Sequence, residues 1–166
     1  MAEGVSEKKL MHKTPEITRL IHENLWIVIS FAFGQPAIAK FVDKRFQGEW
    51  KYLNKTIYET AEIRADRALL EMATQLRVLD DEQQLGNYLA QTKGPPLGKV
   101  IQADGGETDL HFRDMTNKVI HAERFEWVLS NSDSPKIVCH SNDLTRWKQA
   151  EIDIFLLMGI IGGLMH

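Results

Sequence analysis

The sequence predicts an all-α fold, or a mainly α fold with one small β-hairpin near the C-terminus. Apolar residues recur at helical spacing over most of the chain, and the alternation that is typical of strands is confined to residues 136–154. The chain has 166 residues, of which 43% are hydrophobic and 26% charged, and this suits one globular domain. We therefore expect a flexible N-terminus over residues 1–13 and a single helical domain over residues 14–166, built as a bundle of five or six helices.

The first helix is expected to begin at Thr14, a residue type that caps helix N-termini well, with Pro15 in the first helical position. It should run to about Phe33 and end at Gly34, because glycine commonly terminates helices. Pro36 then fits the start of a second, short helix.

A break at Gln47-Gly48 separates these segments from a long helix over residues 49–79. The apolar stripe of that helix consists of Leu53, Ile57, Ala61, Ala65, Ala68, Leu69, Met72, Ala73 and Leu76. Asp80 or Asp81 can cap one more helix, which ends near residue 91.

Residues 92–107 lack a helical period and contain two prolines and four glycines. They form the longest expected loop, which is either a lid beside a site or a plain connector. Thr108 or Asp109 caps the next helix, which we end near Leu129.

The C-terminal part is expected to hold the hairpin and a last helix. Residues 136–140 are predicted to form one strand and residues 147–154 the returning strand, with the polar turn SNDLTR between them. Asp153 then caps a final apolar helix.

The expected helix from Leu110 to Leu129 carries the most informative polar pattern. Arg113, Asn117 and His121 are spaced by four and four, so they lie along one stripe of that helix. Arg124 comes about one turn later in the same sector. A cation, an amide and an imidazole therefore share one strip of helix surface.

These three residue types can perform phosphodiester chemistry without a metal. The imidazole of His121 can remove or return a proton, the amide of Asn117 can orient a group, and Arg113 can bind a phosphate. Structural roles are the alternative: Asn117 and His121 satisfy loop backbone groups, and Arg113 pairs with Asp114 or Asp109.

The string Asn117-Lys118-Val119-Ile120-His121-Ala122 resembles the motif helix of the HEPN (higher eukaryotes and prokaryotes nucleotide-binding) superfamily. That resemblance implies a small helical bundle, often dimeric, that either cleaves RNA or serves as a binding or structural module. Active members usually place arginine directly before the asparagine, where this chain has Thr116. Either Arg113 supplies the charge from one turn earlier or the site is degenerate. The same helix also resembles uncharacterised bacterial proteins in which a hairpin with tryptophan follows it, and that likeness implies no activity.

Several classes of protein and site are disfavoured. The net charge of −3 gives no global field that would recruit nucleic acid, and a single cysteine, Cys139, excludes a disulfide within the chain and favours the cytoplasm. The apolar runs at residues 25–33 and 154–165 are shorter than the roughly 20 residues of a membrane-spanning helix. His111 and His121 lie about 15 Å apart along the expected helix, too far for one metal ion.

We therefore expect a HEPN-like cytoplasmic protein that binds or cleaves RNA without a metal or another cofactor. In this hypothesis His121 is the acid or base, Asn117 the orienting residue, Arg113 the phosphate clamp, and Arg124 and Lys118 contact the substrate. The alternative is a non-catalytic module that acts through protein contacts, as a homodimer.

Overall fold

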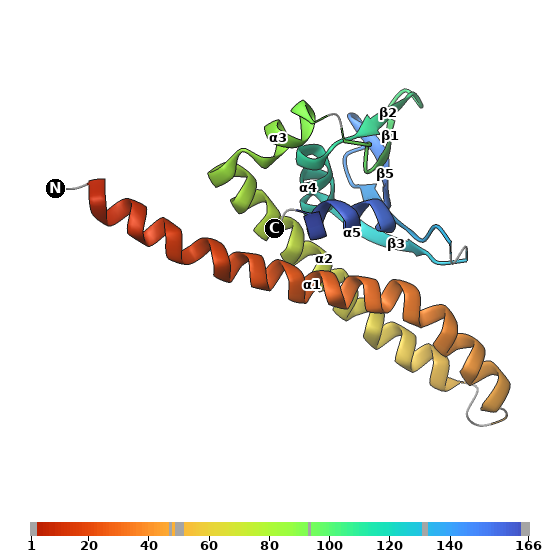
Figure 1. Ribbon diagram of the computed structural model, residues 1–166. Coiled ribbons are helices and arrows are strands. Elements are labelled where there is room, and N and C mark those ends of the chain that lie inside the picture. The colour runs from red at the N-terminus through yellow and green to blue at the C-terminus, as the bar shows by residue number, and fades with distance from the viewer. Residues whose placement is uncertain (1–2, 47, 49–51, 93, 131–132, 164–166) are drawn as a thin grey trace.

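The computed structural model describes residues 3–46, 48, 52–92, 94–130 and 133–163. Within these residues it contains five helices and one five-stranded antiparallel sheet, so the protein has an α+β fold (Figure 1). The prediction of an all-α helical bundle with only a small hairpin is therefore wrong. The helices are α1 (Glu3–Arg45), α2 (Leu53–Gln83), α3 (Leu85–Gln91), α4 (Phe112–Ile120) and α5 (Ile154–Gly163), and the strands are β1 (Gly98–Gln102), β2 (Glu107–Leu110), β3 (Ala122–Val128), β4 (Lys136–Ser141) and β5 (Trp147–Asp153).

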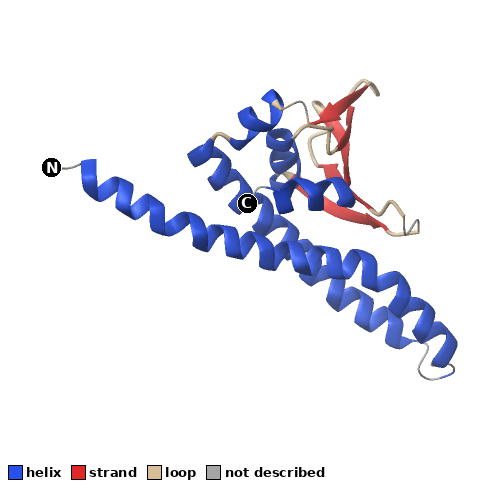
Figure 2. Ribbon diagram, in the orientation of Figure 1, coloured by secondary structure: helices blue, strands red, loops and turns tan. Residues whose placement is uncertain are grey.

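The helices lie to one side of the sheet, and α1 and α2 form a helical hairpin that extends beyond it (Figure 2). Buried apolar residues of this hairpin, of α4 and α5 and of the inward face of the sheet form one continuous core. Trp127 of β3 connects the sheet to the helical hairpin within this core. The Trp127 ring meets that of Phe31 edge-on at 4.9 Å between centroids, and the indole N–H donates to Asp66 at 2.7 Å. The sheet is therefore anchored on the hairpin by one aromatic residue with a satisfied polar group.

A single helix runs from Glu3 to Arg45, through both the expected start at Thr14 and the expected stop at Gly34 and Pro36. A proline inside a helix removes one backbone hydrogen bond and costs about 3 kcal/mol. Here the residues on either side of Pro36 are buried, Phe31 on one side and Val42 on the other. This burial offsets the loss, since continuing the helix keeps both side chains in the core.

Strand order in the sheet is β2-β1-β5-β4-β3, with every neighbouring pair antiparallel. The two strands expected near the C-terminus are present as β4 and β5, but they lie inside a larger sheet. Residues 92–107, expected to be loop, contain β1 and the start of β2. Gly98 is required there because a Cβ at this position would lie 1.8 Å from the carbonyl oxygen of Glu151 in β5.

The prediction of one helix over residues 110–129 is also wrong, because only the first half of this segment is helical. The helix ends at Ile120, His121 caps its C-terminus, and the chain continues directly into β3. Residues 122–128 pair with β4 over the length of the strand, and the aromatic side chains of Phe125 and Trp127 suit a sheet. The expected cap of the last helix is confirmed, since the Asp153 carboxylate accepts the backbone N–H of Leu156 at 3.0 Å.

Candidate functional site

A cleft of about 500 Å³ opens between the C-terminal end of α4 and the loop that joins β4 to β5. Most of its walls are polar, and we call it the polar cleft. Its lining residues are Gln102, Asp114, Asn117, Lys118, His121, Ser141, Asn142, Asp143, Arg146 and Trp147. Three residues that the sequence singled out, Asn117, Lys118 and His121, therefore meet in one cavity.

His121 lies where α4 ends and β3 is about to begin. Its backbone N–H donates to the carbonyl oxygen of Asn117 at 3.0 Å and closes the last turn of the helix. Its side chain is exposed at the cleft, and within the described part of the chain no hydrogen-bond partner occupies the imidazole. The imidazole is therefore available to a ligand as donor or acceptor.

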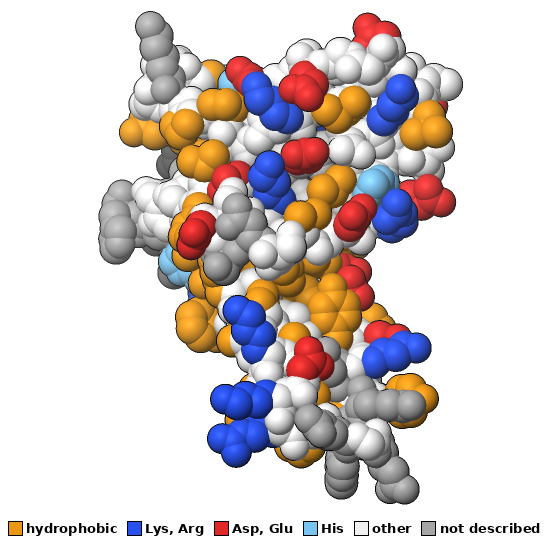
Figure 3. Space-filling view, turned by 90° about the vertical axis from the view of Figure 1, so that its right-hand side faces the viewer, with side chains coloured by type: hydrophobic (Ala, Val, Ile, Leu, Met, Phe, Trp, Pro, Cys, Tyr) orange, Lys and Arg blue, Asp and Glu red, His pale blue; other side chains and the backbone are white. Residues whose placement is uncertain are grey.

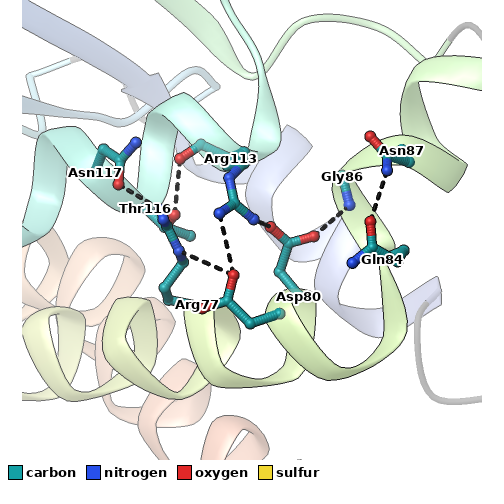
Figure 4. A network of polar contacts seen from close by, with 9 residues as sticks. Arg77, Asp80, Gln84, Gly86, Asn87, Arg113, Thr116 and Asn117 are labelled. Atoms are coloured by element: carbon teal, nitrogen blue, oxygen red, sulfur yellow. Dashed lines mark hydrogen bonds and ion pairs between the residues drawn. The ribbon is translucent and has the colours of Figure 1, made fainter.

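The amide of Asn117 is held from below by Arg77 of α2, which donates to Asn117 Oδ1 (Figure 4). A guanidinium has donors only, so it fixes the oxygen of the amide toward α2 and leaves the Nδ2 donors free. Arg77 is itself placed by Asp81, whose Oδ1 lies 3.5 Å from Nε. Asn117 is thus positioned by a residue of α2 that the sequence did not reveal, and its predicted role as an orienting residue stays a prediction.

Lys118 forms one wall of the cleft. Its ammonium lies 3.3 Å from Asp114 Oδ1 and 4.7 Å from the centre of the Trp147 ring, and only 16% of its side chain is exposed. The ion pair and the cation–π contact hold the ammonium in place. They also cover Trp147, so that ring is not an open stacking surface.

The loop between β4 and β5 supplies the opposite wall. The Asp143 carboxylate accepts both the hydroxyl and the backbone N–H of Thr145, and these bonds lower its pKa from the usual range, with a smaller contribution from the charge of Arg146. Asp143 therefore stays charged and shapes the turn. Arg146 is exposed at the rim and forms no ion pair within 4 Å among the described residues.

Arg113 does not line the polar cleft. Its guanidinium binds Asp80 at 2.5 Å and Asp81 at 3.1 Å, and these hydrogen bonds, the one to Asp80 first, raise its pKa further (Figure 4). It borders a different cavity, of about 460 Å³, together with Gly86 and other residues of α3. Arg113 therefore lies where α4 meets α2 and α3, in the same polar network as Asn117 but outside the lining of the polar cleft.

Arg124 is also outside the cleft, because it belongs to β3 and not to a helix. Its guanidinium lies 3.8 Å from Glu126, whose carboxylate is also 2.7 Å from His140. The structure thus separates the five predicted residues into three at the cleft and two elsewhere.

Sequence reasoning missed the contribution of the β4–β5 loop, above all Arg146. The segment SNDLTR was treated only as a turn. A signal was present, since a tight turn between two strands projects its polar side chains past the end of the sheet, where the end of a packed helix can meet them.

No family model, no curated protein and no solved structure matches this chain. The likeness to the HEPN motif helix consequently stays a prediction. Within the described residues, no group of three or more His, Cys, Asp or Glu side chains is arranged to hold a metal ion.

Proposed function

We propose that this protein binds single-stranded RNA by holding its phosphate groups in the polar cleft. The observation that carries the proposal is the convergence of Asn117, Lys118 and His121 from α4 with Arg146 from the β4–β5 loop around one open cavity. Phosphate oxygens are acceptors, and all four of these side chains can donate hydrogen bonds.

The two acidic residues of the cleft are already engaged, and the side-chain donors of Asn117, His121 and Arg146 are left to a ligand. Asp114 pairs with Lys118, and Asp143 is bound by Thr145. Because Lys118 covers Trp147, the cleft offers hydrogen bonds and charge but no stacking surface. The proposed mode of recognition is therefore of the sugar–phosphate backbone, with little preference among bases.

Cleavage is the further step of this proposal. His121 would take the proton of a 2′-hydroxyl while the hydroxyl oxygen attacks the phosphorus, and the imidazolium would return that proton to the 5′-oxygen as its bond to phosphorus breaks, leaving a 2′,3′-cyclic phosphate and a 5′-hydroxyl. In the proposal, Arg146 has the phosphate-clamp role that was assigned to Arg113, because Arg146 shares the cleft with His121.

Binding is tested by fluorescence anisotropy with a labelled single-stranded RNA of about ten nucleotides. We expect Arg146→Ala to weaken the affinity about tenfold, since one phosphate contact contributes roughly 1.4 kcal/mol. Arg124→Ala is the matched control, because Arg124 is also an exposed arginine but lies outside the cleft. Wild type that does not bind RNA, or equal weakening by both variants, would refute the proposal.

Two further measurements define the ligand and the chemistry. Competition by DNA of the same sequence and by inorganic phosphate separates recognition of RNA from simple binding of phosphate. Cleavage is followed by gel analysis of the same RNA at concentrations that saturate binding, and His121→Ala should abolish it under these conditions. Cleavage that persists in His121→Ala would exclude His121 as the base.

A further inference from the structure

The face of α1 that points away from α2 is exposed although much of it is apolar. Trp26 is 68% exposed and Phe41 57%. The stretch Glu16–Arg45 of α1 is long and apolar enough to cross a membrane, and one third of its most apolar 18-residue window is buried. Hydrophobic side chains reach the surface of the helical hairpin below the sheet (Figure 3). A surface of this kind on a helix indicates a partner.

The side chains opposite the buried residues Val28 and Phe31 follow a seven-residue period along the helix. All of them are exposed except Phe33, which is half-buried and packs against Phe155 of α5 at 5.1 Å between ring centroids. We call these positions the outward face of α1. One row consists of Arg19, Trp26, Phe33 and Lys40, and the neighbouring row consists of Glu23, Ser30, Ala37 and Lys44. Two rows that each repeat every seven residues are typical of a helix that packs against another helix.

We propose that a second copy of this chain covers the outward face, with the two α1 helices antiparallel about a two-fold axis between residues 31 and 32. In this register Trp26 lies opposite Ala37 of the other copy, and Phe33 lies opposite Ser30. Each large ring thus meets a small side chain, which permits close packing of the two helices. A two-fold axis repeats both contacts, so the face is complementary to itself.

The charged positions support the same register. Glu23 lies opposite Lys40 of the other copy, and the symmetry places this pair on both sides of the aromatic contacts. The one like-charged pair is Arg19 with Lys44, at the outer ends, where water screens it. Arg19 is also already bound to Glu23 of its own helix at 3.0 Å. The matched rows extend from Arg19 to Lys44, about 38 Å of helix.

A second copy fits this face better than a lipid bilayer does. The neighbouring helix α2 runs alongside α1 and exposes the charged side chains of Lys55, Glu59, Arg67 and Glu71. Moving the hairpin into a hydrocarbon layer would bury these charges at a cost of several kcal/mol each. An antiparallel partner on the outward face contacts α1, with Phe155 of α5 beside Phe33, and leaves the charged side of α2 in water.

The first test is sedimentation velocity of the full chain over a range of concentrations. We expect wild type to form a dimer and Trp26→Glu to dissociate at least about 100-fold more readily, because two copies of the most exposed ring of the outward face are lost. Ile63→Glu is the matched control, since Ile63 is 70% exposed on α2 and lies outside the outward face of α1. Wild type that stays monomeric at high concentration would overturn the proposal.

Charge reversal tests the proposed antiparallel register of the two α1 helices. Glu23→Lys and Lys40→Glu should each weaken the dimer, and the double variant should restore it. Residues 23 and 40 lie about 26 Å apart along one helix, so only contact between copies can produce this rescue. Absence of rescue would contradict the register.

Cross-linking provides a second, independent readout. A variant with both Glu23→Cys and Lys40→Cys should form a disulfide-linked dimer under mild oxidation, and native Cys139 is buried and does not compete.

Flotation with vesicles of phosphatidylcholine and phosphatidylglycerol tests whether a lipid bilayer covers the outward face instead. Vesicle binding by a monomer, lost in Trp26→Glu, would replace the dimer with a membrane as the partner.

Discussion

Asp80 is the residue whose removal should most clearly test how the helices are joined. It lies near the end of α2 and is 2% exposed. One carboxylate oxygen accepts from Arg113 of α4 at 2.5 Å, and the other accepts the backbone N–H of Gly86 in α3 at 2.6 Å. A single buried carboxylate therefore ties α2 to both α3 and α4.

Asp80→Ala removes both acceptors and leaves the Gly86 N–H without one. A hydrogen bond to a charged group contributes about 1.5–3 kcal/mol, and we expect the loss of the Gly86 bond and of the buried carboxylate to lower the free energy of unfolding by about 2–3 kcal/mol. The loss of the Arg113 ion pair adds little to this decrease in the free energy of unfolding, because Arg113 is half exposed and retains Asp81 at 3.1 Å.

The assay is urea unfolding followed by circular dichroism. With a urea dependence of roughly 2–3 kcal/mol per molar, the midpoint should fall by about 1 M in Asp80→Ala. Asp81→Ala is the matched control, since Asp81 is 56% exposed and its midpoint should change by less than about 0.4 M. Asp80→Asn should be intermediate, because its amide keeps an acceptor for Gly86 but turns a donor toward Arg113. Equal midpoints for Asp80→Ala and Asp81→Ala would refute the reasoning.

Two buried groups and one half-buried group give further predictions. The amide nitrogen of Gln35 is buried without a partner among the described residues, so Gln35→Met should raise the free energy of unfolding by about 1 kcal/mol in the same urea assay, and a loss would contradict this. Burial raises the pKa of Asp66 above its ordinary 3.8, against the opposing effect of the Trp127 hydrogen bond, so its charged form disfavours the folded state. Stability from this group is therefore highest below the ordinary pKa and falls as pH rises through the folded value; Asp66→Asn should remove that fall at pH values above the ordinary 3.8, and an unchanged profile would argue against it. Burial raises the pKa of Cys139 to about 12, so a thiol reagent near neutral pH should label it at least about 100-fold more slowly in the folded than in the unfolded protein, and equal rates would contradict its burial.

Local signals in the sequence predicted several elements well. The long alanine-rich helix, the two strands β4 and β5, and the cap at Asp153 each depend on residues close together in the chain. The β1–β2 hairpin was missed because its glycines and prolines resemble those of a loop, and the Asp104-Gly105 turn signal within it was not used. The pairing of β1 with β5 depends on distant residues that no local pattern shows.

The part of the candidate site that depends on local helical spacing was predicted, and the part that depends on other elements was not. Asn117 and Lys118 do lie on one short helix, which ends at His121, and all three reach the same cleft. Arg113 has the same helical spacing, but its guanidinium binds the buried Asp80 of α2. The spacing of residues within one helix gives no information about a binding partner from another element. Arg146 was missed because its place at the cleft depends on how the sheet meets α4.

The order of strands leaves two free edges, β2 and β3, and both have consequences for solubility. Unpaired edge strands can join those of other molecules into growing sheets. Exposed carboxylates stand on both edges, Glu107 on β2 and Glu123 on β3, and the pairing of β3 is also shifted between Ala122 and Arg124. Like charges at the two ends of the sheet therefore disfavour edge-to-edge pairing between molecules, which keeps a sheet with two open edges from growing.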